Sequence, residues 1–263
     1  MLSSPLHRAA SESAPLLRVR GLTRSFARGL ARRNGGSLAL DAIDLELRSQ
    51  DVLGVIGPEG AGKTTLLQCL AGLLKRDAGF VEWFGHSFPG GGSVPGVAYV
   101  PAVPVYYPFL TVRDVLEYRS ARETTGRHRS RGIDSALLRL GLDQRANIQV
   151  ATLSRDERRR LAIAEALSFD PEVILVDSSS VDEHPPLPES ALEALKSHAV
   201  SGGAVAIAVR HAHSIVSVAS RVVVLDEGRI LRAFCADSTD EQHVDQIFPM
   251  TSNGARFVAE RVH

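Results

Sequence analysis

The stretch Gly57-Pro-Glu-Gly-Ala-Gly-Lys-Thr64 fits the phosphate-loop pattern G-x-x-x-x-G-K-[S/T] at every fixed position. The apolar run Val52–Ile56 before it is typical of a buried strand, and leucines recur at helical spacing in residues 65–74 after it. In this strand–loop–helix context, the glycines let backbone N–H groups point at phosphate oxygens, and the start of the helix adds a partial positive charge. The sequence therefore predicts a binding site for a nucleoside triphosphate.

Two side chains at the end of the loop indicate how the triphosphate and its metal ion would be held. Lys63 is expected to reach the β- and γ-phosphates, and the Thr64 hydroxyl is expected to bind Mg²⁺. The nucleotide would contact the whole loop and the first helical turn. This predicted set consists of Gly57, Pro58, Glu59, Gly60, Ala61, Gly62, Lys63, Thr64 and Thr65.

The composition is that of an ordinary globular protein. The 263 residues, 44% hydrophobic and 23% charged, suffice for one large domain or two small ones. The formal net charge of +0 favours neither a nucleic acid nor an anionic membrane as partner, and two cysteines make no disulfide framework. No apolar run approaches the ~20 residues of a membrane-spanning helix. Residues 1–15 lack the apolar core of a signal peptide, so we expect a cytoplasmic chain with a disordered N-terminal tail over residues 1–15.

The strand pattern predicts an α/β fold. Continuous apolar runs, separated by segments of helical character, favour a mostly parallel sheet covered on both faces. These runs lie at residues 52–56, 171–177, 204–209 and 221–225. Residues 38–47 and 80–84 instead contain the alternation of apolar and polar side chains that is typical of half-buried strands.

The second half of the chain has two helical segments and a weakly patterned end. Residues 111–148 are helical in character, and we interpret their basic segment 127–131 as a solvated face rather than a ligand site. Ser154 fits the N-cap of a helix over residues 155–167, because acidic residues follow in its first turn. Residues 233–263 are predicted to form a peripheral appendage.

The order of phosphate loop, helical insert, capped helix and acid-terminated strand resembles the nucleotide-binding subunit of an ABC transporter. The resemblance covers residues 16–231. Within it, residues 112–117 resemble the start of the helical subdomain, and residues 222–230 resemble the strand–turn–strand after the switch region. It implies a P-loop NTPase core with a mostly parallel sheet, an antiparallel β subdomain and a helical insert. The implied ATP-binding domain spans residues 16–232, with the helical subdomain at about residues 108–165.

The resemblance also implies ligands and partners. The cofactors would be ATP and Mg²⁺, with Phe26 at the position that stacks on adenine and Asp177 joining Thr64 at the metal. Ser154 stands in the signature segment, which in this family faces the γ-phosphate held by a second subunit. The implied partners are another ATP-binding subunit, in a homo- or heterodimer, and a separate transmembrane permease. The chain would then lie on the inner face of the cell membrane.

The motifs that perform hydrolysis in this family depart from its pattern here. Ala102 stands where the family has the glutamine that binds Mg²⁺ and the attacking water, and alanine has no side-chain donor or acceptor. Residues 153–157 (Leu-Ser-Arg-Asp-Glu) replace the signature Leu-Ser-Gly-Gly-Gln, so Asp156 and Glu157 place carboxylates where a triphosphate would approach. Ser178 stands at the position of the glutamate that polarises water, and a hydroxyl is no base near neutral pH.

Two further positions leave alternatives open. Counting back from Arg221 places the switch position at Arg210, with His211 one residue later. Either Arg210 replaces the switch histidine, which we prefer, or His211 serves after a one-residue shift. The loop ending at Asp182 is shorter than the family's D-loop. Whether Asp182 corresponds to the aspartate of that loop therefore stays open.

Together these departures predict a protein that binds ATP and hydrolyses it weakly or not at all. The first hypothesis is an ATP-binding transporter subunit that couples MgATP to a separate membrane subunit through its helical insert. The alternative is a non-transport ATP-sensing regulator or scaffold built on the same fold. The neutral charge, the single nucleotide domain and the lack of a coiled-coil insertion argue against DNA-repair or translation ATPases, so no nucleic-acid partner is expected.

Overall fold

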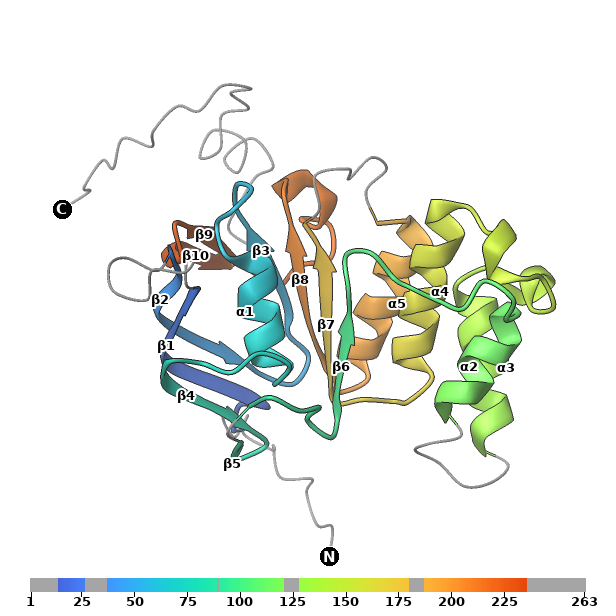
Figure 1. The fold of residues 1–263 in the computed structure, drawn as a ribbon, viewed down its shortest axis with the longest axis horizontal. Coiled ribbons are helices and arrows are strands. Elements are labelled where there is room, and N and C mark those ends of the chain that lie inside the picture. Colours follow the sequence, from blue (N-terminus) through green and yellow to red (C-terminus); the bar gives the residue numbers. More distant parts are fainter. Residues whose placement is uncertain (1–13, 27–36, 89, 121–127, 180–186, 236–263) are drawn as a thin grey trace, which may run out of the picture.

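The computed structural model folds into two β-sheets flanked by helices (Figure 1). It describes residues 14–26, 37–88, 90–120, 128–179 and 187–235. Within these residues the larger sheet has six strands in the order β10-β9-β3-β8-β7-β6. These strands are β3 (Val52–Ile56), β6 (Val97–Val100), β7 (Val173–Ser178), β8 (Ala204–Val209), β9 (Arg221–Asp226) and β10 (Arg229–Cys235).

The larger sheet is parallel except at one edge. β3 pairs in parallel with β8 and β9, and β7 pairs in parallel with β8 and β6. β10 alone is antiparallel, joined to β9 by a tight turn. The predicted mostly parallel sheet is therefore confirmed. The carboxyl ends of β3 and β7 lie at the same edge of this sheet, where ligands bind in open α/β folds.

The central strands are buried on both faces, as their continuous apolar runs predict. Every residue of β3, β7 and β8 is buried, and alternate residues enter two separate apolar cores. Leu53 and Leu175 belong to the core shared with α1 (Lys63–Leu70) and the smaller sheet. Ile56 and Val176 belong to the core shared with the helices of the opposite face.

The smaller sheet is antiparallel and packs beside α1. Its order is β2-β1-β4-β5, with β1 (Leu17–Phe26), β2 (Ser37–Leu47), β4 (Ala78–Trp83) and β5 (His86–Ser87). Trp83 is fully buried and donates its indole N–H to the Leu70 carbonyl at 2.7 Å. This bond ties the end of α1 to the sheet, because a buried indole N–H requires an acceptor.

A helical layer covers the other face of the larger sheet (Figure 1). It contains α2 (Val112–Ser120), α3 (His128–Arg139), α4 (Arg155–Leu167) and α5 (Glu189–Val200), with short 3₁₀ turns at Asp143–Arg145, Val150–Thr152 and Ala212–Ser214. α2 begins after Thr111, whose backbone N–H and hydroxyl exchange hydrogen bonds with Asp114. Of the predicted basic segment, Arg127 lies outside the described residues, as do the side chains of residues 128–131.

The described residues begin at position 14 and end at Cys235. Residues 1–13 and 236–263 lie outside the described residues, and β10 includes the first residues of the predicted appendage, Ala233 to Cys235. Within the ranges described, none of the helices has the length and apolar character needed to cross a membrane.

Candidate nucleotide site

The loop between β3 and α1 follows a path that requires glycine at two positions. A Cβ at Gly57 would lie 2.0 Å from the Leu225 carbonyl oxygen, and one at Gly62 would lie 2.3 Å from the Ala39 carbonyl oxygen. Gly62 also has a φ of 103°, which other residues rarely adopt. The loop is therefore packed against the backbones of β9 and β2, and α1 begins directly after it. A helix that starts after a glycine loop binds phosphate through its first backbone N–H groups.

The Lys63 side chain lies inside this loop. It is 4% exposed, and its ammonium donates hydrogen bonds to the carbonyl oxygens of Gly57 at 2.8 Å and Pro58 at 2.7 Å. A buried ammonium needs several acceptors, because burying a charge without hydrogen-bond partners carries a large free-energy cost. The loop therefore holds a positive charge at the point where the sequence predicts the β- and γ-phosphates.

Three oxygen-bearing side chains meet next to Lys63. The Thr64 hydroxyl donates to Asp177 Oδ2 at 2.7 Å, and the Ser179 hydroxyl donates to Asp177 Oδ1 at 2.6 Å. The two hydroxyl oxygens are 3.3 Å apart. Asp177 is only 1% exposed, at the end of β7. The structure thus brings together Thr64 and Asp177, the two residues that the sequence predicts as metal ligands.

Tyr99 on β6 completes the surroundings of Asp177. Its hydroxyl lies close to the side chain of Gln68, one turn after Thr64 on α1, and to the Asp177 carboxylate. Burial, together with the negative charge of Asp177, raises the pKa of Tyr99 to about 12. Tyr99 is therefore a neutral phenol beside the Asp177 carboxylate near neutral pH.

The residue after Asp177 has a cationic partner. Ser178 is 1% exposed, and its hydroxyl accepts a hydrogen bond from the Arg159 guanidinium of α4. Arg159 comes from the helix that starts at Ser154, so this bond links the capped helix to the strand end. The position at which the resemblance places a carboxylate base thus holds a hydroxyl bonded to a permanent positive charge.

The segment around Ser154 is a helix start with its charges paired. Ser154 accepts a hydrogen bond from the Glu157 backbone N–H, and the Glu157 carboxylate accepts one from the Ser154 N–H at 2.8 Å. The bonds from Ser154 lower the pKa of Glu157, and Arg145 pairs with the same carboxylate at 2.9 Å. Asp156 pairs with Arg160 at 3.0 Å. Both carboxylates that we expected to repel a triphosphate are thus engaged by arginines and by the helix start.

The remaining predicted positions lie around this centre. Phe26, at the end of β1, is 40% exposed, and the Arg24 guanidinium lies 5.0 Å from its ring centroid. Arg210 follows the last residue of β8, and the rings of His211 and His213 stack with centroids 5.6 Å apart. Arg210 and His211 both remain candidates for the switch position.

The sequence also singled out Ala102 and Asp182. Ala102 follows β6 and is half-buried, with a methyl group as its side chain. Asp182 lies outside the described residues.

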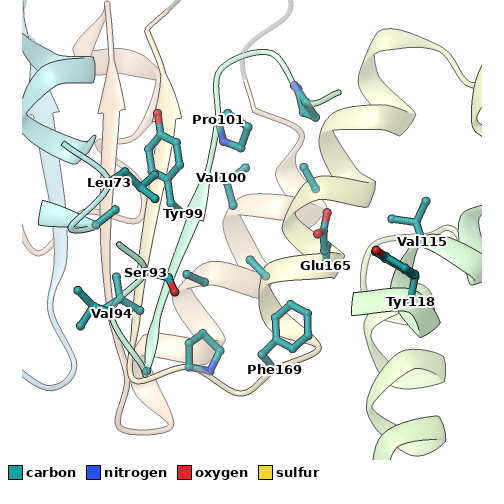
Figure 2. Close-up of a pocket in the computed structure, with 18 of the residues that line it drawn as sticks. Leu73, Ser93, Val94, Tyr99, Val100, Pro101, Val115, Tyr118, Glu165 and Phe169 are labelled. Atoms are coloured by element: carbon teal, nitrogen blue, oxygen red, sulfur yellow. The ribbon is translucent and has the colours of Figure 1, made fainter. Parts of the chain in front are cut away.

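A large pocket lies between β6, at the edge of the larger sheet, and helices α2 and α4 (Figure 2). Its volume is about 1060 Å³, and Figure 2 shows Val100 and Pro101 on the sheet side, with Glu165 and Tyr118 on the helical side. Apolar side chains are exposed in the segment after β6 and on α2. They are Val103 (70% exposed), Val105 (87%), Tyr107 (66%), Phe109 (66%) and Tyr118 (61%).

Sequence reasoning missed four residues of the site: Gln68, Tyr99, Arg159 and Ser179. A signal existed for Gln68, since a residue four positions after Thr64 lies on the same helix face. For Tyr99 the signal was its place near the carboxyl end of β6. This strand pairs in parallel with β7, and the carboxyl ends of neighbouring parallel strands lie at the same edge of the sheet. Nothing in the sequence pairs Arg159 with Ser178, because that contact joins separate elements through tertiary packing.

Comparison with known proteins places these features in a family. The family model described as ABC transporter matches residues 40–181. The SkfA peptide export ATP-binding protein SkfE of Bacillus subtilis (strain 168) is 26% identical, over 86% of this chain and 92% of that protein. The daunorubicin resistance ATP-binding protein DrrA3 of Streptomyces coeruleorubidus is 31% identical, over 80% of this chain and 67% of that protein.

A solved structure shares the fold. The dimeric structure of a bacterial ABC transporter cassette superposes with a TM-score of 0.71 at 20% identity, covering 84% of this chain and 98% of that one. At this identity the likeness shows the fold, with its α/β core and antiparallel sheet.

Proposed function

The chain belongs to the ABC transporter family, and we propose that it is the ATP-binding subunit of a complex whose membrane-spanning part is a separate chain. It binds MgATP, couples binding to that partner, and hydrolyses ATP slowly or not at all. The observation that carries the proposal is a contrast between neighbouring residues of the site. The residues suited to phosphate and metal, Lys63, Thr64 and Asp177, lie together, whereas the next residue of β7 is Ser178 bonded to Arg159.

The side chains at this site fit ATP with Mg²⁺. Thr64 offers a hydroxyl and Asp177 a carboxylate, and Mg²⁺ is usually held by one or two carboxylates together with phosphate oxygens. Lys63 would exchange the carbonyl oxygens of Gly57 and Pro58 for β- and γ-phosphate oxygens. When bound, Mg²⁺ would neutralise part of the phosphate charge.

Slow hydrolysis follows from the chemistry at Ser178. A positioned general base typically contributes ~10²–10⁴-fold to a rate, and a serine hydroxyl does not remove a proton from water near neutral pH. Arg159 lowers the proton affinity of that hydroxyl further, because its positive charge is within hydrogen-bonding distance. Ala102 offers no second group to orient water.

The exposed apolar surface supports a membrane-subunit partner. Val105, Tyr107 and Phe109 project from the segment beside the large pocket, and exposed apolar patches of this kind mark interaction sites. We propose that the permease subunit docks at this surface, which would hold the chain at the inner face of the membrane. A second ATP-binding subunit, identical or different, would face the helix start at Ser154.

A second candidate function is a non-transport ATP-sensing regulator. The Ser178–Arg159 contact together with Ala102 favours it, because a sensor needs ATP binding without turnover. The exposed aromatic surface beside the helical layer favours the transporter subunit instead, since it calls for a stable partner.

Purification from native membranes distinguishes the two functions. The tagged chain is extracted in detergent with MgATP, and the proteins that co-purify are identified. We expect a multi-span membrane protein to co-purify with the wild-type chain. Recovery of soluble partners only would contradict the transporter proposal and support the regulator.

A matched pair of variants locates the docking surface. Y107S/F109S removes two exposed aromatic side chains and is expected to lose the membrane partner. L231S removes an exposed apolar side chain on β10, away from the pocket, and is expected to keep it. Retention of the partner by both variants would show that it docks elsewhere.

A further inference from the structure

We propose that Ser179 is a direct ligand of the Mg²⁺ ion, supplying a third protein oxygen beside Thr64 and Asp177. The inference rests on the proposed MgATP site and adds a ligand to it. Ser179 follows the last residue of β7, and its side chain was not among those that the sequence marks for metal binding.

The spacing of the three oxygens supports the proposal. Mg²⁺ binds oxygen at about 2.0–2.1 Å in octahedral geometry, which places neighbouring ligand oxygens about 2.9 Å apart. The Thr64 hydroxyl is 2.7 Å from Asp177 Oδ2, and the Ser179 hydroxyl is 2.6 Å from Asp177 Oδ1. The two hydroxyl oxygens are 3.3 Å apart. These distances lie on both sides of the spacing of about 2.9 Å between adjacent magnesium ligands, and the two hydroxyls lie next to different oxygens of the one carboxylate.

Ser179 is held in this position by its own backbone. Its N–H donates to Asp177 Oδ1 at 3.1 Å, so backbone and hydroxyl bind the same carboxylate oxygen. Such a turn fixes the Ser179 backbone beside the carboxylate, and the hydrogen bond of the hydroxyl then orients the short side chain. The oxygen cluster is thus preorganised before any ion arrives.

The charge of the cluster indicates how the ion would arrive. Asp177 contributes the single carboxylate, and Thr64 and Ser179 are neutral. Within the described ranges, no group of three or more His, Cys, Asp or Glu side chains is placed to hold a metal. A site with one carboxylate binds Mg²⁺ mainly together with substrate phosphates. We therefore expect metal binding at Ser179 to depend on bound nucleotide.

Ser178 provides the matched control. It is the same residue type at the preceding position, and its hydroxyl is bonded to Arg159 rather than to Asp177. Ser178 is bonded to Arg159 of α4 and Ser179 to Asp177, so the two serines test different surroundings with the same change of atoms.

The first experiment measures metal and nucleotide binding separately in the full chain. Mn²⁺ replaces Mg²⁺ as the probe, and electron paramagnetic resonance reports free Mn²⁺ during titration with the protein and ATP. S179A is expected to weaken Mn²⁺ binding in the presence of ATP by at least about tenfold. It should leave ATP affinity in EDTA unchanged, and S178A should leave both within about twofold of wild type. Equal effects of S179A and S178A would overturn the proposal.

The second experiment separates direct ligation from orientation of Asp177. In S179C a thiol takes the place of the hydroxyl, and thiolates prefer soft ions. ATP binding by S179C is expected to shift its preference from Mg²⁺ toward Cd²⁺, with no such shift in S178C. If S179C keeps the wild-type preference, Ser179 only orients the carboxylate and the proposal fails. Absence of ATP binding by the wild-type chain, with or without metal, would instead defeat the proposed function itself.

Discussion

The Arg159 guanidinium donates a hydrogen bond to the Ser178 hydroxyl, one residue after Asp177 at the end of β7. Asp177 faces the phosphate loop through Thr64, whereas Ser178 faces α4. Two consecutive residues of one strand therefore have different surroundings, the proposed metal site on one side and a cationic contact on the other. This separation is the physical basis of the proposal that ATP is held rather than turned over.

Restoring a carboxylate at Ser178 alone is expected to raise hydrolysis little. In S178E the new side chain would pair with Arg159, and such an ion pair lowers the pKa of the carboxyl and weakens it as a base. We expect an increase in phosphate release of less than about tenfold, below the ~10²–10⁴-fold typical of a positioned base. S178E/R159Q frees the carboxylate and should exceed S178E. A fast enzyme from S178E alone would show that Arg159 and Ala102 do not limit the rate.

Removal of the Lys63 ammonium is expected to abolish MgATP binding. Hydrogen bonds to charged groups contribute about 1.5–3 kcal/mol each, and Lys63 would make at least two to the phosphates. Equilibrium titration of K63A should therefore detect no binding at concentrations that saturate the wild type. K75A, which removes an exposed lysine after α1, is the control and should bind normally. Unchanged affinity in K63A would refute the phosphate-loop assignment.

The titration of Tyr99 gives a test of the geometry around Asp177. Its pKa is raised to about 12, whereas an unperturbed tyrosine titrates near 10. Between these values the folded state binds more protons than the unfolded state, so stability falls as pH rises from about 10 to 12. The difference in ultraviolet absorbance between wild type and Y99F, followed as the pH is raised, should therefore show the ionisation of Tyr99 near pH 12. A transition near pH 10 would mean that Tyr99 is not buried against Asp177.

Loss of the Ser154 hydroxyl is expected to destabilise α4. The hydroxyl accepts the Glu157 backbone N–H, and replacing an N-cap serine by alanine typically costs about 1 kcal/mol. Urea unfolding of S154A should show a free energy of unfolding lower by this amount. An S154A protein as stable as wild type would show that the cap is dispensable.

The sequence was sufficient to predict the parallel core and the phosphate loop, and tertiary contacts explain what it could not supply. Continuous apolar runs such as Val52–Ile56 are diagnostic because both faces of the strand are buried. Gly62 and Lys63 follow a fixed local spacing, so their places in the loop can be predicted from the sequence alone, whereas their roles in binding phosphate stay predictions.

The pairing of charges in the signature segment was not predictable in the same way. The prediction that Asp156 and Glu157 lie where a triphosphate would approach stays a prediction, and the structure adds that they pair with Arg160 and Arg145. Arg145 is distant in the sequence, and its position depends on how the 3₁₀ turn packs against α4. The contact of Arg159 with Ser178 likewise depends on the packing of α4 against β7.

The most direct test of the central claim is a measurement of ATP binding and turnover on one sample of the purified chain. ATP labelled at the γ-phosphate is added with Mg²⁺, unbound nucleotide is removed, and bound ATP and released phosphate are followed over time. We expect bound ATP that persists, with turnover far below the ~10 s⁻¹ that is typical of enzymes. Phosphate release at that typical rate, or no bound ATP at all, would contradict it.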